Sequence, residues 1–173
     1  LEKIKNLIVL QQPKAIMQKL DDLDRKILDI LIENTRTPFT DIAKRLLISA
    51  GTVHVRVKKM EDTGIIKGSS LTLDYKMLGY NFIAYVGVLI DRSKRTYEII
   101  EELKKKPYIT VAHITTGKYN IFLKIRAKGT EHAREIIFSI DDVEGVLRTE
   151  TMISLEESIN DKKRLMKSIF NEL

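Results

Sequence analysis

The stretch Ser49–Ile66, SAGTVHVRVKKMEDTGII, constrains the fold of this chain more than any other part of it. Its β-branched residues suit a strand, but its apolar residues do not keep the period of two that a half-buried strand requires. They fall at helical spacing instead, at Ala50, Val53, Val57 and Met60. Ser49 is placed as an N-cap, and Gly64 is placed to end a helix. The stretch therefore predicts an amphipathic helix.

The opposite face of this predicted helix is polar and basic. It carries Gly51, Thr52, Val55, Lys58 and Lys59, with His54 and Arg56 at its flanks. Between Lys44 and Lys67 there are six basic residues and only two acidic ones, whereas residues 21–41 hold six acidic residues. The whole chain has a net charge of +6, which is a weak signal by itself. The local excess of positive charge indicates a face that suits a polyanion.

Two more helices are predicted directly before this one. The first runs from about Asp22 to Asn34, with Asp21 or Asp22 as its cap and with Leu20, Leu23, Ile27, Ile30 and Leu31 at helical spacing. The second is short, with Thr37 as N-cap, Pro38 as first residue, and Phe39, Ile42, Ala43 and Leu46 on its inner face. This arrangement predicts a helix-turn-helix, whose last helix enters the major groove of DNA. A three-helix bundle with a solvated basic face is the alternative on pattern alone.

The rest of the chain predicts mainly strands. We expect strands at 66–73, 82–90, 108–116, 120–127 and 143–155, a hinge at 74–81, and helices at 93–107 and 129–140. In the helix at 93–107, Tyr97, Ile100 and Leu103 are expected to point inward. From residue 82 on, the order βαββαβ predicts a ferredoxin-like domain, so the fold class is α+β. Both helices would cover one face of the sheet, and burial of the other face predicts a homodimer.

Several classes of protein are excluded by composition. The chain has no cysteine, which excludes disulfides and thiolate metal sites. His54, His113 and His132 fall in three different elements and lack metal-ligand spacing. No apolar run approaches the roughly 20 residues that span a bilayer, and no signal peptide is visible. We therefore expect a cytoplasmic protein with no membrane partner, no catalytic or metal site and no cofactor.

Residues 20–68 resemble the DNA-binding domain of the Lrp/AsnC family of transcription regulators, and the asparagine-responsive AsnC type most closely. The landmarks are Leu23-Asp24-Ile27-Leu28, Arg36, Ala43-Lys44, Ser49, Arg56-Val57, Met60 and Gly64-Ile65-Ile66. The resemblance implies double-stranded DNA as partner, contacted through Ser49, Gly51, Thr52, His54, Val55, Arg56, Lys58 and Lys59. Leu47 departs from the family, which usually has glycine there. Leu47 is strained if the position requires a positive φ, and otherwise the turn differs.

Residues 78–156 resemble the regulatory RAM domain of the same family, which binds small effectors, usually amino acids, between subunits. The segment TTGKYN matches the family's glycine-x-aromatic-acid turn, although Asn120 stands where many relatives have aspartate. The resemblance implies effector contacts from Thr115, Thr116, Gly117, Lys118, Tyr119 and Asn120, and from Thr149, Glu150 and Thr151 of a neighbouring subunit. Asparagine is the first candidate effector, and an octamer of four dimers is expected. Alternatively, Gly117 and Asn120 are simply hairpin residues.

Together these patterns predict five regions. They are an N-terminal extension at 1–19, a helix-turn-helix domain at 20–66, a linker strand and hinge at 67–81, a RAM domain at 82–157 and a C-terminal helix at 158–173. The last helix has Leu165, Met166, Ile169, Phe170 and Leu173 on one stripe, which suits either a subunit interface or packing within one chain. The predicted function is an effector-responsive transcription regulator. The alternatives are an enzyme like the sirohaem decarboxylases, which share the architecture, and an amino-acid-binding module without a DNA role.

Overall fold

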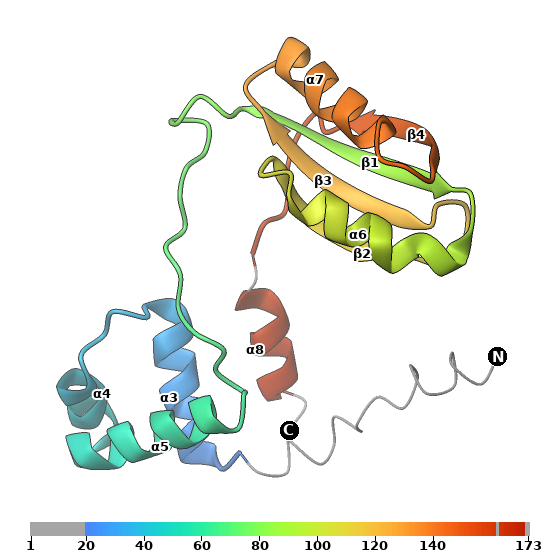
Figure 1. Cartoon of the computed structure of the whole chain (residues 1–173). Helices are drawn as coiled ribbons and strands as arrows, with labels where there is room; N and C mark the ends of the chain where they lie inside the picture. Colours follow the sequence, from blue (N-terminus) through green and yellow to red (C-terminus); the bar gives the residue numbers. More distant parts are fainter. Residues whose placement is uncertain (1–19, 162, 172–173) are drawn as a thin grey trace. The chain divides into compact units, whose positions relative to one another are not determined.

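The computed structural model describes residues 20–161 and 163–171, and the chain divides into two compact units. Residues 20–71 and the described residues from Asn160 onward form the first, here called the helical unit, and Thr72–Ile159 form the second, here called the sheet unit. Figure 1 shows the elements of each in chain order. Among the described residues, no helix has the length and apolar character that crossing a membrane requires.

Three helices of the helical unit enclose its core. They are α3 (Asp22–Glu33), α4 (Phe39–Leu46) and α5 (Ala50–Asp62). The buried side chains are Ile27, Leu28, Ile42, Ala43, Val53, Val57 and Met60. All of them except Leu28 are inward positions that helical spacing predicts, and the other predicted positions, among them Leu23, Ile30 and Leu46, are half-buried. The predicted three-helix arrangement is confirmed.

The ends of α5 follow from its sequence. The hydroxyl of Ser49 accepts the backbone N–H of Thr52 at 3.0 Å, as an N-cap does. Gly64 lies beyond the last turn with a φ of +76°, and the N–H of Ile66 donates to the carbonyl of Met60 at 3.0 Å. This is the usual way in which glycine closes a helix. Both predicted ends are therefore confirmed.

The start of α4 differs from its predicted form by one residue. The helix begins at Phe39, with Pro38 at the N-cap position. Thr37 was expected to be the cap, but its hydroxyl donates to the carbonyl of Asn34 at 2.8 Å. Thr37 therefore tightens the turn after α3, and no side chain caps α4.

Leu47 follows α4 in a left-handed conformation, with φ +56° and ψ +43°. It is the non-glycine residue of the described chain that has a positive φ. Its side chain is 92% exposed, so packing does not compensate for the conformation. The sequence left open whether Leu47 is strained or the turn differs. The positive φ shows that Leu47 is strained.

The C-terminal helix α8 (Lys163–Asn171) belongs to the helical unit and lies against α3 (Figure 1). Met166 and Ile169 are half-buried, whereas Leu165 is 68% exposed. Packing within one chain is therefore what the structure shows for this helix. The side chain of Phe170 and all of Leu173 lie outside the described residues, as does the predicted extension at 1–19.

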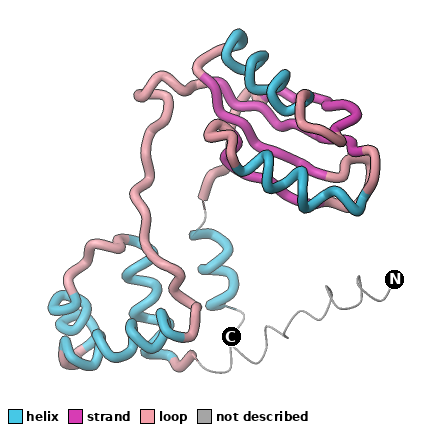
Figure 2. Tube along the Cα trace, in the orientation of Figure 1, coloured by secondary structure: helices cyan, strands magenta, loops and turns pink. Residues whose placement is uncertain are grey.

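The sheet unit is a four-stranded antiparallel sheet covered on one face by helices. Its strands are β1 (Phe82–Ile90), β2 (Ile109–Ile114), β3 (Ile121–Ala127) and β4 (Val146–Ile153), in the spatial order β2-β3-β1-β4. A 3₁₀ turn, η1 (Ser93–Arg95), leads into α6 (Thr96–Lys104), and α7 (Thr130–Asp141) precedes β4. Figure 2 shows the alternation of strands and helices. The predicted βαββαβ order is confirmed.

Alternate strand residues form the core of the sheet unit. The buried set is Ala84, Val86, Val88, Ile90, Ile121, Leu123, Ile125 and Ala127 from the strands, and Ile99, Leu103, Ala133, Ile136 and Ile140 from the helices. One detail of the prediction was wrong. Ile99 and Leu103 are the fully buried apolar residues of α6, whereas Ile100 is half-buried and Tyr97 is exposed. Ile99 and Ile100 lie four and three residues before Leu103, and both spacings fit one helix face, so the spacing did not decide between them.

The strand predicted at 66–73 is absent from the described chain, where residues 66–74 have no regular structure. Strand backbone groups need a partner strand, and this segment has none among the described residues. The following turn is anchored to the sheet unit. Arg126 donates from Nη1 to the carbonyl of Tyr80 at 3.2 Å, and its guanidinium lies 4.8 Å from the ring centre of Tyr75. The part of the predicted hinge from Tyr75 to Tyr80 is therefore held on the sheet unit by Arg126.

Candidate nucleic-acid interface and effector turn

The exposed face of α5 carries two shallow hollows. One is lined by Asp21, Gly51, Thr52, Val55, Arg56 and Lys59, and the other by His54, Val55, Lys58, Lys59, Asp62 and Thr63. Val55 and Lys59 belong to both, and Val55 is 66% exposed although it is apolar. The structure thus brings the predicted DNA-contacting residues of α5 onto one surface, which we call the reading face: Gly51, Thr52, Val55, Lys58 and Lys59.

Three predicted contacts at the edge of this surface have local partners. The hydroxyls of Ser49 and Thr52 lie 2.9 Å apart, so Ser49 is held at the helix start by its capping role. The ring of His54 lies 6.0 Å from that of Phe39, across the α4–α5 junction. Lys58 forms an ion pair with Asp62 at 2.9 Å, and this hydrogen bond raises the pKa of Lys58. Lys58 therefore stays positively charged.

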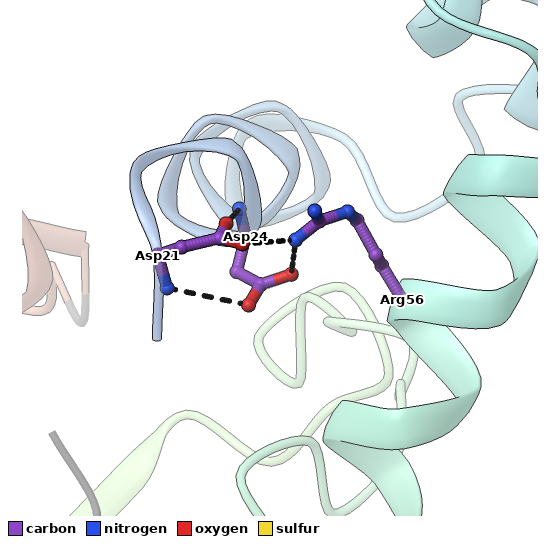
Figure 3. A network of polar contacts seen from close by, with 3 residues as sticks. All are labelled: Asp21, Asp24 and Arg56. Atoms are coloured by element: carbon purple, nitrogen blue, oxygen red, sulfur yellow. Dashed lines mark hydrogen bonds and ion pairs between the residues drawn. The ribbon is translucent and has the colours of Figure 1, made fainter. Parts of the chain in front are cut away.

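Arg56 extends from α5 toward the start of α3 (Figure 3). Its Nη1 donates to Oδ2 of Asp21 at 2.6 Å and to Oδ1 of Asp24 at 2.8 Å. The hydrogen bond from Arg56 lowers the pKa of Asp21, and the two carboxylates raise the pKa of Arg56. The sequence placed Arg56 among the DNA contacts, whereas the structure uses its guanidinium within the protein. The sequence pointed to Asp21 only as a candidate helix cap and to Asp24 only as a landmark of the family resemblance.

The segment TTGKYN forms the turn between β2 and β3. The N–H of Thr115 donates to the carbonyl of Asn120 at 3.0 Å, and the hydroxyl of Thr115 donates to the carbonyl of Tyr119 at 2.8 Å. Gly117 has a φ of +107°, a conformation that other residues rarely adopt. Thr116 is exposed within the same turn. The turn is therefore closed by its own hydrogen bonds.

Asn120 joins this turn to strand β1. Its side-chain oxygen accepts the N–H of Ile90 at 3.1 Å, and its own N–H donates to the carbonyl of Val88 at 3.0 Å. The side chain is half-buried. These bonds support the alternative in which Asn120 is a structural residue of the hairpin, because an effector would compete with β1 for the amide oxygen.

Lys118 and Tyr119 converge on Glu150 of the same chain. Lys118 Nζ and the Tyr119 hydroxyl each donate to Oε2 of Glu150 at 2.6 Å, and Arg148 also donates to this carboxylate. The ring of Tyr119 lies over Gly87, where a Cβ atom would come within 2.6 Å of the ring. Sequence reasoning missed Gly87 and Arg148. Arg148 could have been found from strand alternation, which places it on the same face as Glu150.

Thr149 and Thr151 do not share the surface of Glu150. In the register of β4 with β1, they pair with Val88 and Val86, on the face that the helices cover. Glu150 pairs with Gly87, on the other face. Consecutive strand residues point to opposite sides of a sheet, so the three predicted contacts cannot form one surface. Among the described residues, no group of His, Asp and Glu could hold a metal ion.

Comparison with known proteins agrees with both units. Residues 20–61 match the model of the AsnC-type helix-turn-helix domain, and residues 83–163 match that of the Lrp/AsnC ligand binding domain. The chain is 35% identical over 144 residues to the regulatory protein AsnC of Haemophilus influenzae, which covers 83% of this chain and 96% of that protein. The relatives are transcription regulators by name, which sets aside the sirohaem-decarboxylase alternative.

Solved structures agree in the same way. The structure of E. coli AsnC superposes with a TM-score of 0.79 at 33% identity, covering 82% of this chain and 96% of the other. A transcriptional regulator of Neisseria meningitidis, solved as a complex with L-Met, shares the fold with a TM-score of 0.78 at 23% identity, covering 83% and 95%. This chain is a member of the Lrp/AsnC family of transcriptional regulators.

Proposed function

We propose that this regulator recognises specific DNA sequences through the reading face of α5 and that its DNA binding responds to an amino acid bound at the turn 115–120. The observation that carries the first part is the surface itself. Val55, an exposed apolar residue, lines one hollow together with Thr52 and Lys59. A thymine methyl, a base edge and a phosphate are the groups that these side chains suit.

Salt dependence and site preference test the DNA proposal separately. Lys59→Ala should weaken binding on all duplexes alike and lower the slope of log affinity against log salt by about one, because one phosphate contact is lost. Thr52→Ala should instead change which duplexes are selected from a random-sequence pool. If both variants bind and select as the wild type does, the reading face is assigned wrongly.

The effector proposal rests on the charges around the turn. Lys118 and Arg148 surround the single carboxylate of Glu150, which leaves an excess of positive charge. A free amino acid can exchange into this cluster, with its ammonium on Glu150 and its carboxylate on Lys118. The N. meningitidis regulator of the same fold was solved with L-Met, which supports an amino acid as ligand class. Asparagine remains the first candidate, from the likeness to AsnC proteins.

Thermal unfolding against each of the twenty amino acids tests this proposal. A ligand at about 100 times its dissociation constant should stabilise the chain by roughly 2.7 kcal/mol. Glu150→Gln should remove the thermal shift. Glu101→Gln is the control, because it also breaks an ion pair, with Lys104 on α6, but should keep the shift. Equal shifts in both variants, or none in the wild type, would remove Glu150 from the effector site.

We also propose a homodimer that buries the sheet face without helices, and, from the family resemblance, an octamer of four dimers. That face carries Ile83, Tyr85, Leu89, Phe122 and Met152, and the rings of Tyr85 and Phe122 stack at 5.9 Å. Met152→Arg should shift the sedimentation coefficient toward that of a monomer. Phe138→Arg, at a more exposed apolar residue on α7, should leave it unchanged.

A further inference from the structure

We infer that Arg56 is a positioning residue, which holds α5 on the start of α3 through Asp21 and Asp24 and so gives the reading face one orientation. This inference rests on the DNA-binding function proposed above and adds a role for residues outside the reading face. It also replaces the direct DNA contact that the sequence predicted for Arg56.

The three residues form a closed set of hydrogen bonds (Figure 3). Asp21 accepts the N–H of Asp24 at 2.9 Å, and Asp24 accepts the N–H of Asp21 at 3.3 Å, which makes a reciprocal capping box. Each carboxylate then offers its second oxygen to Nη1 of Arg56. All four carboxylate oxygens are used, so the guanidinium has one favoured position relative to the start of α3.

The burial of Asp24 makes its pairing with Arg56 necessary. Asp24 is 2% exposed, and a buried carboxylate is tolerated only when it is paired and hydrogen-bonded. Arg56 lies 32 residues further along the chain, so the pair is a tertiary contact between α3 and α5. Removal of Arg56 would leave the buried charge without its cation, and α3 and α5 would then move apart to admit water.

The contact of Arg56 with Asp21 and Asp24 lies next to two residues of the reading face. Thr52 lies one turn before Arg56 on α5, and Lys59 lies one turn after it. Asp21 and Arg56 line the same hollow as both residues. A rotation of α5 would therefore displace both Thr52, the proposed base contact, and Lys59, the proposed phosphate contact.

The charge balance separates positioning from phosphate binding. Nη1 of Arg56 already lies between two carboxylates, so its positive charge is offset within the protein. A residue that does not displace a counterion from DNA contributes nothing to the salt slope of binding. Loss of Arg56 should therefore lower affinity for the preferred sequence without changing that slope.

The experiment uses the full chain, a duplex that the wild type selects from a random-sequence pool, and a scrambled duplex of the same composition. For Arg56→Ala we expect affinity for the selected duplex to fall about tenfold or more, affinity for the scrambled duplex to fall about threefold or less, and the salt slope to stay at the wild-type value. Lys59→Ala is the matched control, because it should lower the slope and weaken both duplexes alike. A lower slope in Arg56→Ala, with sequence discrimination retained, would overturn the inference.

Asp24→Asn gives a second test with the opposite electrostatic expectation. Removal of a negative charge near DNA should raise affinity for a polyanion, whereas loss of the positioning contact should lower affinity for the selected duplex. We expect the fall, and we expect the double variant Asp24→Asn/Arg56→Ala to lose no more than Arg56→Ala alone. A rise on both duplexes would overturn the inference.

Folding and function can be separated in the same series. Circular dichroism at the binding temperature shows which variants remain folded, and Asp21→Asn, at the exposed carboxylate, is the milder variant if Asp24→Asn unfolds. Asp21→Asn should also reduce discrimination between the two duplexes, and unchanged discrimination would count against positioning. If the wild type itself selects no sequence, the proposed DNA function fails. If the wild type selects and the Arg56 variant does so equally well, only the positioning role fails.

Discussion

Leu47 is a residue whose identity conflicts with its backbone. Its left-handed conformation costs a residue with a Cβ atom roughly 1–2 kcal/mol, and its side chain is exposed. Glycine relieves this strain but gives the unfolded chain more freedom, which offsets about half of the gain. We expect Leu47→Gly to raise the free energy of unfolding by about 0.5–1 kcal/mol, as measured by urea denaturation.

Leu47→Ala is the control for this prediction. It removes the same exposed leucine but keeps the Cβ atom that causes the strain, so its stability should stay close to that of the wild type. If Leu47→Gly destabilises the chain while Leu47→Ala does not, the left-handed conformation is not the source of strain.

The lowered pKa of Asp21 predicts how acid changes the stability of the helical unit. The hydrogen bond from Arg56 lowers its pKa from the usual value of 3.8. A lowered pKa contributes stability that is fully present above the unfolded value, near 4, and is lost as the pH falls through the folded value. The unfolding free energy should therefore fall below about pH 4 more steeply in the wild type than in Asp21→Asn. Urea titrations from pH 5 to pH 2.5 check this, and parallel curves would contradict it.

At the scale of elements, the sequence predicted what local chemistry determines. Ser49 and Gly64 set the ends of α5 through their own hydrogen bonds and φ angle, so both could be seen without a structure. On α6 the prediction chose Ile100 instead of Ile99, because both residues lie at a helical spacing from Leu103, which is inward as predicted. The prediction of a strand at 66–73 was wrong, because a strand depends on a partner that the segment itself does not specify.

The candidate sites also contain some residues that local spacing predicts and others whose partners lie far along the chain. Residues of the reading face are neighbours on one helix, so spacing predicts them. The partners of Arg56 lie 32 and 35 residues away, and no local pattern shows that its guanidinium turns inward. Thr149 and Thr151 could have been excluded, since strand alternation alone puts them opposite Glu150.

Gly87 offers a test of the effector turn from the neighbouring strand. A Cβ atom there would overlap the ring of Tyr119, so Gly87→Ala should displace the ring and break the Tyr119–Glu150 hydrogen bond. We expect the variant to lose most of the thermal shift caused by the effector while the sheet still forms. Gly51→Ala adds the same methyl group at an ordinary contact distance on α5 and should keep the full shift. An unchanged shift in Gly87→Ala would show that the ring position is unimportant.

At the scale of the whole molecule, the chain passes between its two units twice. It leaves the helical unit after Leu71 and returns to it at Asn160, where it continues into α8. Two segments of the chain therefore connect the units, and the second one leads into the helix that packs on α3. Helix α8 begins at residue 163, where the match to the ligand-binding domain ends, so the connecting segment lies within the matched residues and the helix extends beyond them.

Release of α8 should show what the second connection contributes. Met166→Asp/Ile169→Asp places charges on the half-buried side of the helix, which should cost about 1–2 kcal/mol of unfolding free energy and speed hydrogen exchange in α3. Leu165→Asp, on the exposed side of the same helix, should do neither. With one connection lost, the effector should also change DNA affinity less than in the wild type, because its binding then restrains the helical unit through a single linker. Equal effects of Leu165→Asp and the double variant on exchange would mean that α8 packs on α3 through another face.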